Sequence, residues 1–280
     1  SQEDLTKAKE AALAAEVEAK GLGTQLNDLD QKYLSAQNAA NAAYNKLSET
    51  PFMANVMSTY RNTDATPDDV EDTIDFGDGT IAKATKVYDE KWQIDTDAVQ
   101  GLNDQIAYQE KEVAKAELKV KEAEKALADK KATQAYKDAV AAVDAAQKAY
   151  DEATTSADKE NAWNTLQNAK NALEAITVVE EDNVEQATND KEYAEEWLAD
   201  LQETQTYVND TKAYDEYVKL YDEYVKLRDA EEEAQIAYLK VEHNWNIKNT
   251  LATNLSNVAN NMTDYAELIN DCNEKINNAK

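Results

Sequence analysis

Three acidic residues in one short stretch, Asp72, Asp75 and Asp78, have the type and spacing that could hold a hard cation. Carboxylate oxygens on a flexible loop are the ligands that Ca²⁺ prefers, and Gly77 and Gly79 lie among these residues. The spacing departs from an EF-hand loop, in which a glutamate closes the site at the twelfth position. An ordinary acidic turn is the alternative, and it is the interpretation we favour.

Histidine and cysteine, two of the residue types that most often carry out catalysis, are scarce in this chain. The single histidine, His243, and the single cysteine, Cys272, cannot form a Cys/His zinc site, and one cysteine excludes an internal disulfide. A Ser/His/Asp triad cannot be argued when His243 stands alone, and the Glu-x-x-His motifs of di-iron bundles cannot be built. The tripeptide Asp75-Phe76-Gly77 matches a protein-kinase motif, but no HRD sequence accompanies it. We therefore expect no enzymatic activity and no cofactor.

Binding to a partner is the chemistry that the remaining unusual residues favour. Residues 49–83 hold both prolines, both phenylalanines and two of the three methionines, and methionine mixed with aromatic residues is common at adaptable binding surfaces. Trp163 falls near the tip of a predicted helical hairpin, where an exposed ring could stack on a sugar or anchor a protein. Packing inside a small cap, or at the end of the hairpin, is the alternative. The candidate contact residues are Phe52, Met53, Met57, Tyr60, Arg61, Phe76 and Trp163.

The elements that must position these residues are helices. The chain of 280 residues contains 5 Gly and 2 Pro, and neither occurs after Gly101. Helix-forming residues fill that long run, and a hydrophobic content of 42% is enough for a folded core. The predicted fold class is all-α: an elongated antiparallel helical bundle or coiled coil with a protruding helical hairpin and one irregular insertion.

The charge of the chain limits its partners. The formal net charge is -28, from 57 acidic against 29 basic residues, so phosphate backbones and anionic lipid surfaces are repelled. Nucleic acid is therefore excluded as an expected partner. No stretch approaches the roughly 20 apolar residues that a membrane-spanning helix needs, and we expect no transmembrane segment.

Apolar residues alternate at spacings of four and three along three stretches, as they do along a coiled-coil seam. Many of these positions are alanine, which allows close approach of helices. In the repeated heptad YDEYVKL at 214–227, we expect the tyrosines at 214, 217, 221 and 224 to pack as large side chains against alanine-rich helices. The predicted seams are Leu22, Leu26, Leu29, Tyr33, Ala36, Ala40, Ala43 and Leu47; Val99, Leu102, Ile106, Gln109, Val113, Ala116, Val120, Ala123 and Leu127; and Leu251, Leu255, Val258, Met262, Tyr265, Ile269, Cys272 and Ile276.

Breaks in these patterns divide the chain into five predicted segments. A kink is expected near 129–133, where the heptad phase is lost, and Thr155 with Asp158 forms a predicted N-cap. A helix start is predicted at Thr66-Pro67-Asp68-Asp69, with proline at the first helical position. Weaker breaks are expected at Thr177-Val178-Val179 and at Asn209-Asp210-Thr211. The segments are a long bundle helix at 1–48, an irregular cap with a short helix at 49–83, a second long helix at 84–128, a helical hairpin at 129–178, and returning helices at 179–280.

Together these features favour a non-enzymatic structural or interaction protein of the bacterial cell envelope: an elongated helical spacer, an adhesion module or a subunit of a complex. The polar start SQED favours export, with a lipid anchor before Ser1 as a further option. A glycan- or ligand-binding surface protein and a cytoplasmic coiled-coil scaffold are the alternatives. The expected partners are one or more proteins, with a glycan as a further option.

Overall fold

The computed structural model of the chain describes residues 1–63 and 67–279. Helices make up 84% of the structure, so the predicted all-α fold class is confirmed. The chain divides into two compact units, residues 1–93 with 210–280 and residues 94–209. In the described part of the chain, no helix combines the length and the apolar character that crossing a membrane requires.

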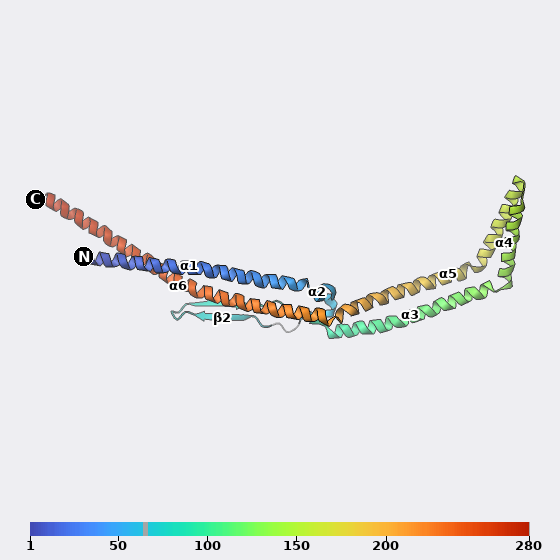
Figure 1. The fold of residues 1–280 in the computed structure, drawn as a ribbon, viewed down its shortest axis with the longest axis horizontal. Coiled ribbons are helices and arrows are strands. Elements are labelled where there is room, and N and C mark those ends of the chain that lie inside the picture. The colour runs from blue at the N-terminus through green and yellow to red at the C-terminus, as the bar shows by residue number, and fades with distance from the viewer. Residues whose placement is uncertain (64–66, 280) are drawn as a thin grey trace. The chain divides into compact units, whose positions relative to one another are not determined.

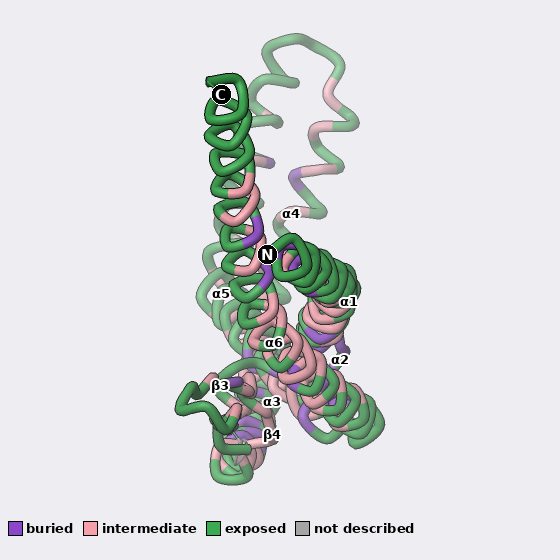
Figure 2. The backbone as a smooth tube through the Cα atoms, turned by 90° about the vertical axis from the view of Figure 1, so that its left-hand side faces the viewer, coloured by how far each residue is buried: buried purple, intermediate pink, exposed green. Residues whose placement is uncertain are grey.

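The first unit is built on two long helices, α1 (Gln2–Ser48) and α6 (Thr211–Asn278), which run antiparallel and side by side (Figure 1). The first predicted seam is confirmed, because all its positions from Leu22 to Leu47 are buried or half-buried. Buried residues form only a minor part of either helix, and most of the surface of both is exposed (Figure 2). A two-helix contact of this kind buries one narrow stripe on each helix.

The third predicted seam has the wrong register. α1 packs on Ala252 and Ala259, each 5% exposed, because two alanines one heptad apart let the helix axes approach closely. Two of the predicted positions, Leu255 and Met262, are half-buried beside this contact. The other six predicted positions are exposed: Leu251, Val258, Tyr265, Ile269, Cys272 and Ile276.

The chain between α1 and residue 94 folds into a cap of short elements. Strands β2 and β3 pair antiparallel, with Val70 opposite Lys86 and Asp75 opposite Ile81, and β1 pairs with β4. Two glycines in the β2–β3 turn, Gly77 and Gly79, have φ of 80° and 88°, a region that other residues rarely adopt. The elements are α2 (Pro51–Asn55), a 3-10 helix (Ser58–Tyr60), β1 (Arg61–Thr63), β2 (Val70–Asp75), β3 (Ile81–Lys86) and β4 (Trp92–Ile94).

Two predictions about this region are wrong. Of the predicted helix start at 66–69, Thr66 lies outside the described residues, and the chain continues from Val70 as a strand. The long helix predicted at 84–128 begins only at Thr96, because Asp95 is its N-cap and accepts two backbone N–H groups at 3.0 and 3.1 Å. The cap therefore extends past residue 83, and it contains strands where a helix was expected.

The second unit contains α3 (Thr96–Lys131), α4 (Gln134–Glu152) and α5 (Ser156–Val208), and both α3 and α4 pack on α5 (Figure 1). The second predicted seam is confirmed, with Leu102 and Ile106 at 1% and 7% exposure and the rest buried or half-buried. Gln109 is a buried polar member of this seam. Its side-chain nitrogen donates to the carbonyl of Ala194 at 3.0 Å, which gives this buried donor a partner.

The helix ends of this unit follow the predictions except at one place. The predicted kink near 129–133 is the break between α3 and α4. The predicted N-cap is confirmed: Thr155 Oγ1 accepts the N–H of Asp158 at 3.1 Å, and its hydroxyl donates to the Asp158 carboxylate at 2.6 Å. The break at 209–211 is also confirmed, whereas α5 passes through 177–179 without interruption. The predicted hairpin therefore has no boundary at residue 178.

Candidate functional site

Two of the predicted contact residues are part of the cap's interior. Phe52 is 1% exposed, and its ring centroid lies 5.1 Å from that of Tyr214 and 4.9 Å from that of Tyr217. The Arg61 guanidinium lies over the rings of Phe52 and Trp92, at 6.0 and 5.4 Å. Burial lowers the pKa of Arg61, and its Nε has no hydrogen-bond partner in the described structure. Phe52 therefore packs the cap on α6, and Arg61 packs within the cap.

The other predicted contact residues of the cap have different surroundings. Met53 and Tyr60 are half-buried, and Met57 is 56% exposed. Phe76, in the β2–β3 turn, stacks on His243 of α6, with ring centroids 3.9 Å apart and planes 10° apart. Of this predicted set in the cap, Met57 is the one large apolar side chain that faces solvent.

The structure does not bring the three predicted calcium ligands together. Asp72 lies in β2 opposite Ala84, while Asp75 and Asp78 each accept the N–H of the residue two positions later, at 2.8 and 2.9 Å. The pKa of Asp78 is below its usual value, mainly because of the hydrogen bond from the Thr80 N–H and then because of the one from the Thr80 hydroxyl. Asp78 also contacts His243 at 2.8 Å. Within 1–63 and 67–279, no group of three or more His, Cys, Asp or Glu residues is placed to hold a metal.

Trp163, the predicted contact residue of the second unit, lies near the start of α5. Its side chain is 47% exposed, and its ring lies 5.6 Å from that of Tyr150 of α4. The indole thus packs against the hairpin on one side and is accessible on another. Its role in binding a partner stays a prediction.

Three of the four tyrosines of the repeated heptad are buried, as predicted, and Tyr214 is half-buried. Tyr217, Tyr221 and Tyr224 are 1%, 2% and 0% exposed, and successive ring centroids lie 6.3 and 5.6 Å apart. Their neighbours are themselves aromatic: the ring of Tyr44 of α1 lies 5.4 Å from that of Tyr224. The tyrosines therefore form a row of rings along α6, where alanine was expected to face them.

The hydroxyl groups of this row bind the chain that leaves β3, a role that sequence reasoning missed. Tyr217 accepts the N–H of Trp92 at 2.8 Å, and Tyr221 donates to the carbonyl of Asp89 at 2.7 Å. Burial raises the pKa of Tyr217 to about 12 and also raises the pKa of Tyr221. Leucine at these positions would leave two partly buried backbone groups without these partners, which explains why the heptad carries tyrosine.

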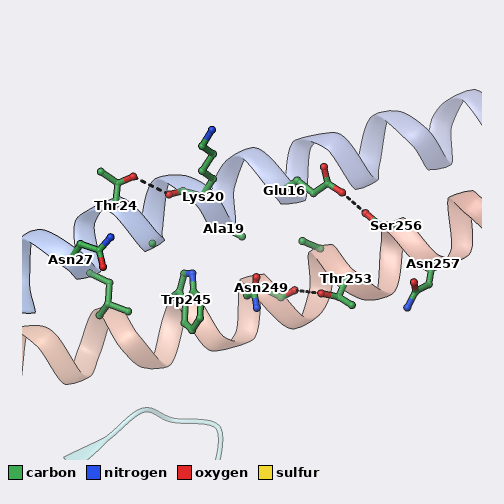
Figure 3. Close-up of a pocket in the computed structure, with 13 residues that line it drawn as sticks. Glu16, Ala19, Lys20, Thr24, Asn27, Trp245, Asn249, Thr253, Ser256 and Asn257 are labelled. Atoms are coloured by element: carbon green, nitrogen blue, oxygen red, sulfur yellow. Dashed lines mark hydrogen bonds between the residues drawn. The ribbon is translucent and has the colours of Figure 1, made fainter.

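A groove of about 720 Å³ lies between α1 and α6 at Trp245 (Figure 3). Trp245 points from α6 toward α1 and lies beside Gly23. A Cβ at position 23 would lie 3.2 Å from the indole Nε1, which is a tight contact, so glycine leaves room for the ring here. Two buried alanines, Ala19 and Ala252, line the groove beside the indole and leave it unfilled.

The rim of the groove is polar. The hydroxyl of Thr24 donates to the carbonyl of Lys20 at 3.2 Å, and Thr253 donates to the carbonyl of Asn249 at 3.0 Å (Figure 3). These two threonines use their donors within their own helices, but each hydroxyl oxygen can still accept. A hydrogen bond between Ser256 and the Glu16 carboxylate links the helices at one end of the groove.

Three asparagine side chains complete the lining. Asn27, Asn249 and Asn257 are exposed, and their amides make no hydrogen bond in the described part of the chain. An amide offers two donors and one carbonyl acceptor, so these groups can bind a neutral hydroxyl in either direction. With the half-buried indole of Trp245, they provide an apolar wall and a polar rim in one place.

Trp245 was not among the contact residues predicted from the sequence. A signal for the groove was present, because a glycine inside a long helix costs about 1 kcal/mol relative to alanine and indicates a packing reason. The partner of Gly23 on α6 could not be identified, since pairing of α1 with α6 depends on the whole fold. No protein-family model, no curated protein and no solved structure matches the chain.

Proposed function

We propose that this chain is a non-enzymatic binding protein, and that the groove at Trp245 holds a neutral polyhydroxylated ligand such as a sugar ring of a glycan. One observation carries the proposal. A half-buried indole and three asparagine side chains without hydrogen-bond partners in the described chain line the same groove.

The chemistry of a sugar ring fits this lining. One face of the ring presents C–H groups that pack on an indole, and its hydroxyls need both donors and acceptors. The volume of about 720 Å³ lies within the range of roughly 300–1,000 Å³ for small-molecule sites. The groove contains one acid and one base, Glu16 and Lys20, so it does not select strongly for a charged ligand.

Binding to an array of glycans, followed by calorimetry on those retained, tests this function. Asn249→Ala removes an amide that makes no hydrogen bond in the described chain, so we expect a folded protein with roughly three- to tenfold weaker binding. Asn260→Ala changes an exposed asparagine of α6 outside the groove and is the matched control. Retention of no glycan, or equal affinity of the two variants, would contradict the proposal.

A second candidate function is assembly, in which α6 packs against a second copy of the chain. Leu251, Val258 and Tyr265 form a stripe at heptad spacing, and they are 43%, 50% and 68% exposed. From Leu251 to Thr263 the helix carries no charged side chain. Around Leu251 and Val258, a second copy would therefore meet no like charge on this helix. This function would agree with the predicted role as a spacer or subunit of the bacterial envelope, and that location stays a prediction.

Light scattering over a range of protein concentrations tests assembly. We expect a dimer that forms as concentration rises and that Val258→Glu weakens strongly, because a charge would be placed in the contact. Val179→Glu, at a 62% exposed position of α5, is the control and leaves the dimer intact. A monomer at every concentration would exclude this function.

A further inference from the structure

A second cavity, of about 250 Å³, lies in the first unit where β3 meets α1 and α6. Its lining comes from three parts of the chain and is almost entirely polar or charged. The lining residues are Tyr33 and Gln37 of α1; Thr85, Lys86 and Val87 at the end of β3; and Arg228, Glu231, Glu232 and Gln235 of α6.

One of the two cations at this cavity, Lys86, is fully engaged. Its ammonium lies 2.9 Å from the Asp229 carboxylate and 2.8 Å from Glu232 Oε2. The hydrogen bonds to Glu232 and Asp229 raise the pKa of Lys86, so it stays protonated. Its ammonium also lies 5.5 Å from the ring centroid of Tyr88.

The other cation, Arg228, is engaged as well. Its guanidinium lies 2.7 Å from Glu231 and 3.4 Å from Asp89, and its Nε donates to the Tyr224 hydroxyl at 3.0 Å. The two cations are therefore paired with four carboxylates. Asp229 and Glu232 bind Lys86, and Glu231 and Asp89 bind Arg228. The cluster carries an excess of two negative charges.

One carboxylate oxygen of this cluster is buried without a hydrogen-bond partner among the described residues. Glu232 is 8% exposed, and its Oε1 is buried without a hydrogen bond in the described structure. A buried charged oxygen left unpaired is costly, and such groups are rare in folded proteins. Glu232 is also one of the residues that line the cavity.

Neutral oxygen atoms surround the same space. The side chains of Gln37, Gln235, Tyr33 and Thr85 line the cavity, and none makes a hydrogen bond within the described residues. Burial, and then the charge of Glu231, raises the pKa of Tyr33, so its hydroxyl stays neutral. Both cations of the cavity are thus already paired with carboxylates, while several neutral acceptors in its lining are not engaged within the described residues.

We propose that this cavity binds the ammonium group of a small primary amine, which donates one hydrogen to Glu232 Oε1 and the others to neighbouring side-chain oxygens such as those of Gln37 and Gln235. A primary ammonium has three donors and one positive charge, which match the unpaired oxygen, the neutral acceptors and the excess negative charge. The site differs in place and in ligand class from the groove at Trp245. In the described chain no three-ligand metal group is present that would favour a metal ion instead.

Titration of the full chain with n-butylammonium, followed by NMR of the side-chain amides, tests this site. The neutral alcohol n-butanol has nearly the same shape and is the ligand control. Salt at about 150 mM suppresses non-specific attraction to the acidic surface. We expect saturable shifts of the Gln37 and Gln235 amides with the amine, and binding of n-butanol at least tenfold weaker.

Substitution of the acceptor separates the site from the general charge of the chain. Glu232→Gln weakens amine binding by roughly tenfold or more, as expected for loss of a charged hydrogen bond. Glu233→Gln removes the same charge from the next residue, which is exposed, and leaves the affinity within about twofold.

Because Glu232→Gln also changes a partner of Lys86, Gln235→Leu is a second variant that leaves this ion pair intact. It removes a neutral acceptor and is expected to weaken binding severalfold while the helix content stays unchanged. The proposal is overturned if the amine shows no saturable binding, so that the cavity holds only water. It is also overturned if n-butanol binds equally well, or if both cavity variants bind like Glu233→Gln.

Discussion

Asp89 and Tyr224 are joined by two hydrogen bonds across 135 positions of the chain: the Asp89 N–H donates to the Tyr224 hydroxyl at 3.1 Å, and that hydroxyl donates to the Asp89 carboxylate. The same hydroxyl also accepts from Arg228 Nε at 3.0 Å. One phenol oxygen therefore fixes the segment after β3 to the middle of α6. This contact links the cap to the cavity that Arg228 lines.

Removal of this oxygen tests its contribution to the fold. Tyr224→Phe leaves the Asp89 N–H and Arg228 Nε without their partner, so we expect the free energy of unfolding to fall by about 1–3 kcal/mol. Urea unfolding measures the loss, and faster amide exchange at Asp89 would locate it. Tyr193→Phe, at a 70% exposed position, should change stability by less than about 0.5 kcal/mol. Equal stability of the two variants would show that the hydroxyl contributes nothing.

The buried tyrosines predict a loss of stability at alkaline pH. Burial raises the pKa of Tyr217 from 10.0 to about 12, so the folded state holds this proton more tightly than the unfolded state does. The stabilisation is complete below about pH 10 and is lost as the pH rises toward about 12, by up to about 3 kcal/mol.

Urea unfolding on either side of this pH window measures the effect. Tyr217→Phe removes the titrating group, so the variant starts less stable and loses less on going to alkaline pH. Tyr193→Phe should keep the pH dependence of the parent, because its side chain is exposed. If the slopes of all three proteins agree, Tyr217 is not the group responsible.

Two glycines two positions apart on α1 provide an internal control for the groove. Alanine in place of Gly21 meets nothing within 4 Å, so the change should stabilise the protein by about 0.5–1 kcal/mol through helix propensity alone. Alanine in place of Gly23 places a methyl 3.2 Å from the indole Nε1 of Trp245, so the same gain is cancelled or reversed. Thermal unfolding compares the two variants. Equal stabilisation would mean that Trp245 does not pack on Gly23.

Adjacent residues of α6 test the register of its contact with α1. Ala252→Asp places an unpaired charge at a 5% exposed position and should cost several kcal/mol. Leu251→Asp changes a 43% exposed side chain and should cost less than about 1 kcal/mol when measured on dilute protein. If Leu251→Asp costs more stability than Ala252→Asp, the seam predicted from heptad spacing is right and the packing of α1 on Ala252 is wrong.

The fold class could be predicted because Gly and Pro, the residues that most often interrupt helices, are scarce in this chain. The seams of α1 and α3 could be predicted from spacing, since large apolar residues such as Leu26 and Leu102 occupy them. The seam near Ala252 was missed because large side chains were preferred to alanine, whereas the helix contact uses the small residues for close approach. The pattern at 66–69 satisfies a local rule for helix starts, but β2 depends on pairing with β3, which is not local.

The candidate site was less predictable than the fold. Predicted contact residues such as Phe52 are apolar and aromatic, and the structure uses several of them to hold the cap in place. The groove at Trp245 arises from side chains that are ordinary on each helix alone. Their combination requires the pairing of α1 with α6, and the sequence contains no local signal for which residues face each other.

Fluorine NMR of protein labelled with fluorotryptophan tests the groove most directly, because the chain has 4 Trp and each gives its own resonance. Trp245→Phe assigns one signal, and the parent is then titrated with a glycan that the array retains. We predict that the Trp245 resonance shifts and saturates, while those of Trp92, Trp163 and Trp197 stay unchanged. A saturable shift at Trp163 in place of Trp245, or no shift at any of the four, would contradict the groove as the binding site.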